Sequence, residues 1–236
     1  MTTLPNVTTT FDWPTALMGE TLMCGLLNKA LYEYPDRAWL QALIDEEVFA
    51  QAPFAEQQPD VIAGLAALQT WTAAHRAGLS VAAFDDLRAD YTRLFVGIDR
   101  VLAAPWESVH FSEERLVFQE KTLQVRNWYL RYGLEPENLH KEPDDHIGLE
   151  LAFLAHLAQR GLQAIEQNDP AVFEDAIAAQ RGFLTEHLLK WTPIWCSLVL
   201  EHAQTEFYRG VALLVRGVLT ELADMFDLKF KLDHTR

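Results

Sequence analysis

The apolar residues of this chain recur at helical spacing, and no alternation of apolar and polar residues extends beyond about four positions. The clearest stripe is formed by His146, Glu150, Phe153 and Leu157, which fall on one face of a helix. The chain has no internal repeat and no low-complexity tract. We therefore predict an all-α fold, a helical bundle of about eight to ten helices.

Proline, glycine and capping residues set the expected helix boundaries. The predicted helices span residues 14–34, 36–48, 59–77, 81–95, 113–132, 143–168, 170–189, 193–203 and 206–227. Residues 1–12 are Thr-rich, and we expect them to form a flexible N-terminal segment. Residues 13–230 are expected to form a single helical domain, because no linker separates two apolar regions.

The net charge of −15 at pH 7 argues against a protein that binds nucleic acid or inserts stably into a membrane, and favours basic partners. The N-terminus lacks the basic start and apolar run of a signal peptide, and the best membrane candidate, 211–219, is interrupted by Arg216. Cys24 and Cys196 lie in apolar helical runs, where buried thiols are expected, although one disulfide is left open. These features predict a cytoplasmic location.

The most distinctive polar stretch is Lys141-Glu142-Pro143-Asp144-Asp145-His146. A proline directly before two aspartates is typical of a helix start, where carboxylates accept bonds from free backbone donors. The positive end of the helix dipole favours ionised carboxylates and a neutral imidazole. The sequence therefore predicts acidic groups at the rim of an apolar stripe, a place suited to a cationic partner. The alternative is that these residues only cap the helix N-terminus and are more numerous than capping requires.

The least regular part of the chain is 96–112, which contains Pro105, Trp106, Val109, His110 and Phe111. Long loops in compact domains are usually functional, and the aromatic content argues against disorder. The loop is expected either to plug the core or to form an apolar wall for a bound peptide.

Other acidic and metal-ligating patterns are weaker. The group Asp85, Asp86 and Asp90 is expected on a solvated helix face. His146, Glu150 and His110 leave open a helical metal-dependent enzyme, but no ligand spacing supports it strongly. No nucleophile motif or phosphate-binding glycine loop is present. We therefore expect no catalytic residues, no metal and no cofactor.

Four pieces of the sequence resemble, in family order, the TorD/DmsD family of maturation chaperones for exported molybdoenzymes. They are Asp90-Tyr91-Thr92-Arg93-Leu94-Phe95-Val96-Gly97, Ala104-Pro105-Trp106-Glu107-Ser108-Val109, Glu142-Pro143-Asp144-Asp145-His146 and Phe207-Tyr208-Arg209. The tryptophan loop resembles the DmsD branch. Phe118-Gln119-Glu120 departs from the Phe-Gly-Asp common in the family.

The resemblance implies a non-enzymatic cytoplasmic chaperone. Such a protein binds the twin-arginine leader of a molybdoenzyme precursor, of DMSO or TMAO reductase type. It delays export until the cofactor is inserted and the precursor is folded. The leader and the export machinery are the implied partners. The implied leader-binding residues are Phe95, Trp106, Ser108, Val109, Glu142, Asp144, Asp145 and His146.

Overall fold

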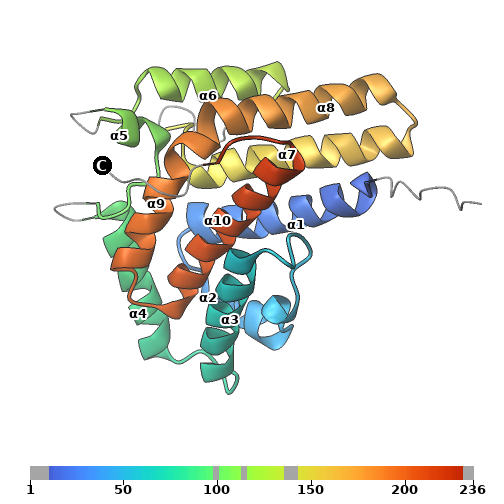
Figure 1. The fold of residues 1–236 in the computed structure, drawn as a ribbon. Helices are drawn as coiled ribbons and strands as arrows, with labels where there is room; N and C mark the ends of the chain where they lie inside the picture. Colours follow the sequence, from blue (N-terminus) through green and yellow to red (C-terminus); the bar gives the residue numbers. More distant parts are fainter. Residues whose placement is uncertain (1–10, 98–100, 113–115, 136–142, 231–236) are drawn as a thin grey trace, which may run out of the picture.

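The structure, a computed structural model, describes residues 11–97, 101–112, 116–135 and 143–230 (Figure 1). Its α-helices are α1 (Trp13–Tyr32), α2 (Arg37–Asp45), α3 (Pro59–Ala74), α4 (Val81–Tyr91), α5 (Glu107–Phe111), α6 (Glu120–Arg131), α7 (Ile147–Glu166), α8 (Pro170–Phe183), α9 (Leu189–His202) and α10 (Glu206–Met225). A 3-10 turn, η1 (Val48–Ala50), and two π-helical segments, η2 (Thr92–Val96) and η3 (Leu184–Leu188), complete them. These ranges contain no β-strand, so the all-α prediction is confirmed.

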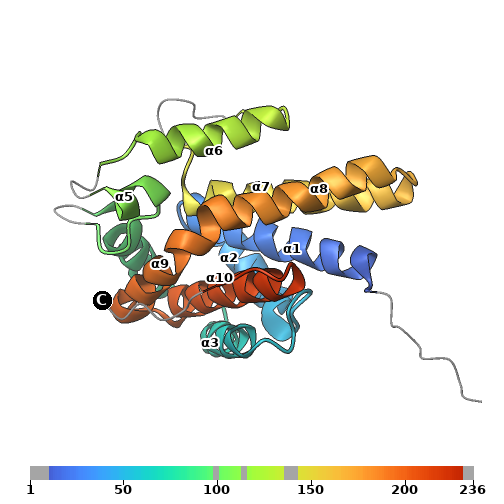
Figure 2. The same ribbon diagram turned by 45° about the horizontal axis from the view of Figure 1, so that its top comes forward.

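Helices α8, α7 and α1 run side by side in the upper half of Figure 1, with α6 along the top edge, and α10 crosses in front of α1 toward α3 and α4. The most extensive contact between helices joins α1 and α7, and the next most extensive joins α3 and α10. One hydrophobic cluster continues through both pairs, from Met23 to Phe226. Helix α6 lies apart from the α7–α8 pair in Figure 2, with its side chains filling the interval.

Glycines allow the two closest helix pairs to approach. A Cβ on Gly148 of α7 would lie 2.7 Å from the Cβ of Tyr32, at the end of α1. Between α3 and α10, a Cβ on Gly64 would lie 2.9 Å from the carbonyl oxygen of Gly210. Neither position has room for a larger residue without moving a backbone, so these glycines set the interhelical distances.

Several predicted caps are present. Ser80 accepts the backbone N–H of Ala83 at 3.1 Å, and Asp169 accepts that of Val172 at 3.1 Å. Gly78 and Gly133 have φ of 115° and 72° and follow helices, as expected for C-terminal glycines. The residue types at these positions thus fix helix ends through local bonds that do not depend on the rest of the fold.

Some predicted boundaries were wrong. Residues 107–111 form α5 inside the expected loop, and α6 starts at Glu120 instead of residue 113. Pro193, expected to begin a helix, lies inside α9. It lies in the second turn of α9, where its missing N–H leaves the carbonyl of Leu189, the first residue of the helix, without its regular helical donor.

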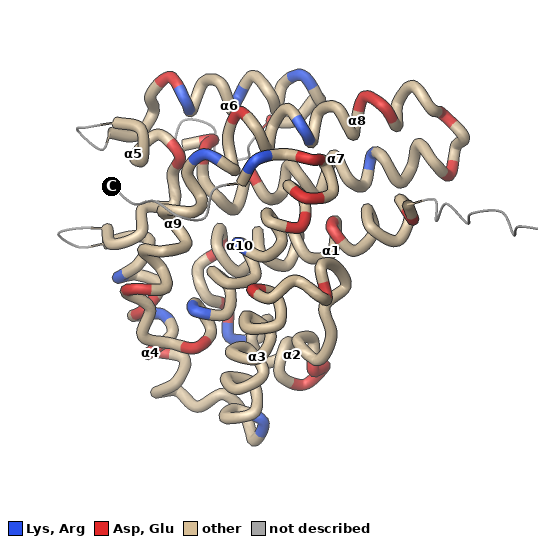
Figure 3. The backbone as a smooth tube through the Cα atoms, viewed as in Figure 1, with Lys and Arg blue, Asp and Glu red and all other residues tan. Residues whose placement is uncertain are grey.

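Acidic residues are spread over the whole molecule and do not gather on one side (Figure 3). Within the described ranges, no helix has the length and apolar character that crossing a bilayer requires. The second observation agrees with the sequence, in which Arg216 interrupts the best membrane candidate, 211–219.

Candidate functional site

The loop that carries Trp106 (104–111, the tryptophan loop) and the turn that carries Asp144 and Asp145 (143–147, the acidic turn) lie directly against each other. The backbone N–H of Glu107 donates to the carbonyl of Asp145 at 2.9 Å, and the N–H of Ile147 donates to that of Pro105 at 2.8 Å. Trp106 and His146 thereby form an isolated antiparallel bridge. We call this contact between residues 104–111 and 143–147 the loop–turn joint. It explains why α7 starts at Ile147 and not at Pro143, because the bridge holds the backbone of His146 in an extended conformation.

The two aspartates of the turn are completely buried and already have partners. Asp145 accepts the backbone N–H of Ser108 at 2.6 Å and the hydroxyl of Thr122 at 2.8 Å. Asp144 accepts the Nε of Arg126, and this hydrogen bond raises the pKa of Arg126. Helix α6 therefore supplies a donor to each carboxylate. The predicted rim of acidic groups beside the apolar stripe was therefore wrong for Asp144 and Asp145, the two members that the structure describes.

His146 is the N-cap residue of α7, a role that the sequence assigned to the aspartates. Its Nδ1 accepts the backbone N–H of Gly148 at 3.0 Å. The ring packs edge-on against Tyr32 and Trp106, with centroid distances of 5.2 and 6.1 Å. Burial lowers its pKa to about 3, so the imidazole is neutral at physiological pH. Neutrality was expected from the helix dipole, but desolvation is its main cause.

Two further ionisable side chains, Glu107 in the joint and Glu150 behind it, are buried. Glu107 is fully buried, with one oxygen 2.7 Å from Nδ1 of His187 and the other 3.6 Å from the amine of Lys121. Glu150 accepts the indole N–H of Trp191 at 3.3 Å. Burial raises the pKa of Glu150 well above its usual value, and the negative charges of Glu107 and Asp145 raise it further.

Most of the predicted leader-binding residues are enclosed. Phe95, Ser108, Val109, Asp144, Asp145 and His146 are buried, and among the predicted residues that the structure describes only Trp106 is partly exposed. Glu142 lies outside the described residues. Phe95 belongs to a different contact, in which its ring stacks on Trp195 at 6.0 Å and meets Tyr208 at 5.4 Å.

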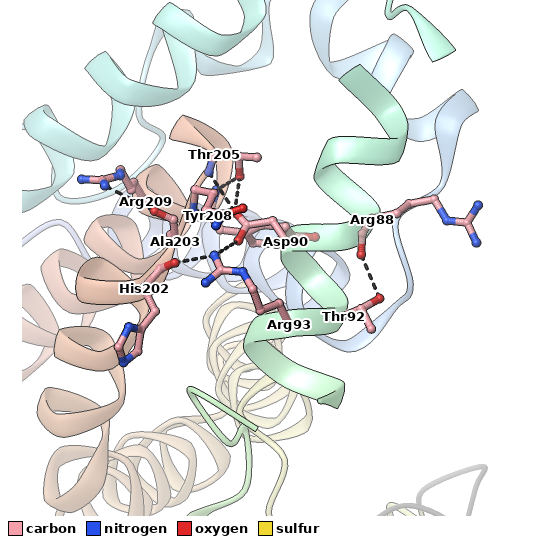
Figure 4. Close-up of polar contacts among 10 residues, drawn as sticks. Arg88, Asp90, Thr92, Arg93, His202, Ala203, Thr205, Tyr208 and Arg209 are labelled. Carbon is pink, nitrogen blue, oxygen red and sulfur yellow. Dashed lines mark hydrogen bonds and ion pairs between the residues drawn. The ribbon is translucent and has the colours of Figure 1, made fainter. Parts of the chain in front are cut away.

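A second junction joins the end of α4 to the start of α10 (Figure 4). Asp90 is buried, and one carboxylate oxygen accepts the backbone N–H groups of Gln204 and Thr205 at 3.0 and 2.8 Å. The other accepts Arg93 at 2.7 Å. The solvated face predicted for this acidic group is thus wrong for Asp90. Figure 4 shows Arg88 pointing away from this junction.

The backbone links the two junctions. The N–H of Ala103, just before the tryptophan loop, donates to the carbonyl of Leu94 in η2 at 2.8 Å. The motif pieces singled out in the sequence therefore meet in two neighbouring places. One is built on Asp90 and the aromatic residues of α10, and the other is the loop–turn joint.

The residues of the alternative metal site serve other contacts. A ring nitrogen of His110 lies 2.9 Å from the carbonyl of Ala104, and the ring packs against Trp191 at 5.1 Å. Across the described ranges, no three His, Cys, Asp or Glu side chains converge in a way that could hold a metal ion. The geometry gives the metal-dependent alternative no support.

An apolar cavity of about 210 Å³ lies beside the joint, between the end of α6 and the first half of α7. Its lining is Tyr129, Leu134, Glu135, Leu149, Ala152, Phe153 and His156. The hydroxyl of Tyr129 donates to the carbonyl of Asp144 at 3.1 Å, which connects this cavity to the acidic turn. Acidic and apolar surfaces are therefore adjacent, although α6 covers the acidic one.

The sequence analysis missed Lys121, Thr122 and Arg126, the α6 residues that face the buried carboxylates. Thr122 and Arg126 are four residues apart and thus share a helix face with the buried Val125 and Tyr129. A basic residue next to the apolar face of a helix indicates a buried acidic partner, and Arg126 beside Val125 is such a signal in this sequence.

Comparison with known proteins places this arrangement in context. Residues 56–197 match the family model described as Nitrate reductase delta subunit. The chaperone protein TorD of Aliivibrio fischeri is 31% identical over 145 residues, 61% of this chain and 64% of that protein. The Tat proofreading chaperone DmsD of Salmonella typhi is 30% identical over 138 residues, 58% of this chain and 60% of that protein. This chain thus spans less than two thirds of either relative.

A solved structure from Archaeoglobus fulgidus, named as a redox enzyme maturation protein, aligns with 89% of this chain and 96% of its own. The TM-score is 0.41 and the sequence identity is 20%.

Proposed function

Because this chain belongs to the nitrate reductase delta subunit family, we propose that it is a cytoplasmic maturation chaperone for an exported redox enzyme. In this proposal it binds the twin-arginine leader of a molybdoenzyme precursor. It delays contact with the export machinery until the molybdenum cofactor is inserted and the precursor is folded, and it catalyses no reaction itself. The names of the TorD and DmsD relatives, chaperone and Tat proofreading chaperone, support the role.

The observation that carries the proposal is the loop–turn joint. It brings Trp106 and the buried Asp144 and Asp145 within one contact, next to the apolar cavity lined by Phe153. A twin-arginine leader has two guanidinium groups followed by an apolar segment. Carboxylates can accept bidentate hydrogen bonds from a guanidinium, and an apolar wall can bury the segment that follows.

Burial of the aspartates constrains how a leader binds. A guanidinium reaches Asp144 or Asp145 only if α6 moves away from the joint, because both carboxylates are fully enclosed. Opening costs free energy, which burial of the apolar segment can offset at about 25 cal/mol per Å². We infer that Phe95, Val109 and Ser108 shape the site from behind and that Trp106 contacts the leader first.

Isothermal titration calorimetry with a twin-arginine leader peptide tests this function. We expect saturable binding that is lost when both leader arginines are replaced by alanine, and that weakens when lysines replace them, because lysine lacks the planar bidentate geometry. The variant Trp106→Ala should weaken binding at least about tenfold, as loss of an aromatic anchor does. Equal affinity for the arginine and alanine peptides contradicts the proposal.

A further inference from the structure

Helix α6 presents to the buried acidic groups the same chemistry that a twin-arginine leader carries. Its inner face holds two cations, Lys121 and Arg126, followed by the buried aromatic residues Trp128 and Tyr129. Lys121 lies near Glu107, and Arg126 binds Asp144. A leader segment placed on the joint would need the positions that these side chains occupy.

The contact between Arg126 and Asp144 is incomplete. Arg126 reaches one oxygen of Asp144 through Nε, and the other oxygen is buried with no hydrogen-bond partner among the described residues. The hydroxyl of Ser108 is also buried without a partner in the part of the chain that the structure describes. A buried polar group that is left unpaired destabilises the fold, because it has lost its hydrogen bonds to water. The joint therefore has unused capacity for hydrogen bonds.

A second arginine pair in the same chain shows what a complete contact looks like. Arg216 of α10 binds both oxygens of Asp60 through Nε and one terminal nitrogen, at 2.7 and 2.6 Å. That pair is bidentate, the strongest arrangement for a guanidinium and a carboxylate. The Arg126 pair lacks this geometry, although its carboxylate is the more deeply buried of the two.

The attachment of α6 to the rest of the molecule is mainly through side chains. Its close backbone neighbour is α5, and it stands apart from α7 and α8 in Figure 2. Its second half is held by Trp128, which packs against Phe183 and donates to Glu186 at 3.1 Å. Its first half, 120–126, makes polar contacts through Lys121, Thr122 and Arg126 and buries one apolar side chain, Val125, in the core.

We propose that the first half of α6 is an autoinhibitory element in which Arg126 occupies the place of a leader arginine on Asp144. This inference rests on the proposed function. A leader arginine replaces the single contact of Arg126 with a bidentate one, and residues 120–126 withdraw from the joint. Arg126 thereby sets how tightly a ligand must bind Asp144 in order to displace it. This favours twin-arginine segments over lysine-rich ones.

The test compares leader affinity in the wild type, Arg126→Gln and Arg216→Gln by calorimetry. Removal of the internal competitor should raise the affinity of Arg126→Gln for the leader about tenfold. Arg216→Gln removes a partly buried arginine pair far from the joint and should leave the affinity unchanged. Because Arg126→Gln leaves a buried carboxylate without its cation, Thr122→Val serves as a second variant, which should raise the affinity about two- to fivefold.

Hydrogen exchange gives a second readout. Addition of leader peptide to the wild type should accelerate exchange of the amides in 120–126 while those of α7 become more protected. Wild-type binding together with unchanged or weaker affinity in folded Arg126→Gln and Thr122→Val overturns the autoinhibitory role alone. Slower exchange in 120–126 on binding does the same. A wild type that does not distinguish arginine from alanine leaders overturns the proposed function as well.

Discussion

A neutral imidazole begins α7 because His146 lies between two aromatic rings and accepts a backbone N–H through Nδ1. Protonation of Nδ1 would remove the cap and place a charge in an apolar site. His146 is thus a structural residue whose titration is suppressed in the folded state, and its effect appears as a pH dependence of stability.

We expect His146→Asn to remove part of the acid sensitivity of the fold. The folded pKa of about 3 lies below the unfolded value of 6.5, so the unfolded chain binds more protons between these pH values. The stabilisation by neutral His146 is complete above pH 6.5 and is lost as the pH falls toward 3. Asparagine keeps a capping oxygen and does not titrate.

Urea unfolding of both proteins from pH 4.5 to 7.5 measures this effect. The unfolding free energy of the wild type relative to the variant should fall by up to about 1.4 kcal/mol per pH unit below 6.5. Glu150, whose raised pKa acts in the opposite sense, is present in both proteins and cancels in the difference. Parallel pH profiles contradict the assignment.

The family resemblance grouped Asp145 and His146 with the tryptophan loop as leader-binding residues, and residue identity and local chemistry predicted a helix start at this turn. They were not enough to predict burial. Asp90 and Asp145 are polar residues near predicted helix ends, and in sequence they look like solvated caps. Their partners, Thr205 and Thr122, are distant in the chain, so only the folded structure reveals that their carboxylates are used internally.

At the scale of elements, the crossing of α3 and α10 depends on the absence of side chains at Gly64 and Gly210. A methyl group on Gly64 meets the backbone of Gly210 and Leu214 at 2.9 and 3.0 Å, which cannot yield as a flexible side chain can. The contact therefore sets the position of the whole C-terminal helix.

Gly64→Ala should destabilise the fold by about 1–2 kcal/mol even though alanine has the higher helix propensity. Gly25→Ala is the matched control: Gly25 lies in α1 with no atom within 4 Å of its added Cβ, so alanine should stabilise by about 0.5–1 kcal/mol. Chemical denaturation of the two variants gives the measurement. Equal changes in the unfolding free energy of both variants would show that helix propensity, and not the contact with α10, determines the effect of the substitution.

Long periodic helices such as α1, α7 and α10 were predictable because their apolar stripes and caps are local signals. Helix α5 was not, because it has only five residues and no periodicity to detect. The start of α7 was predicted too early, since the bridge between Trp106 and His146 overrides the local preference of Pro143 for a helical first turn.

At the scale of the whole molecule, the net charge of −15 should affect the association rate of a cationic peptide more than its dissociation rate. Acidic positions are scattered over the helices in Figure 3, so the attraction of a cationic peptide should not depend on one acidic patch. In the proposed complex, the deep burial of Asp144 and Asp145 would shield their contacts with a leader from salt.

We expect the association rate constant of a twin-arginine leader to fall about tenfold between roughly 0.02 and 0.5 M salt, with little change in its dissociation rate constant. Stopped-flow fluorescence with a labelled leader measures both. A leader whose arginines are replaced by glutamine should show a smaller salt effect on association. An association rate constant independent of salt would contradict electrostatic steering.

The bridge at the loop–turn joint is made by main-chain atoms of Glu107, Asp145, Pro105 and Ile147. Peptide groups are common to all amino acids, so substitution of the surrounding side chains should leave this backbone pairing in register. Under the proposed function, Trp106, whose side chain is partly exposed, is accordingly the first position to vary in order to change which leader is preferred.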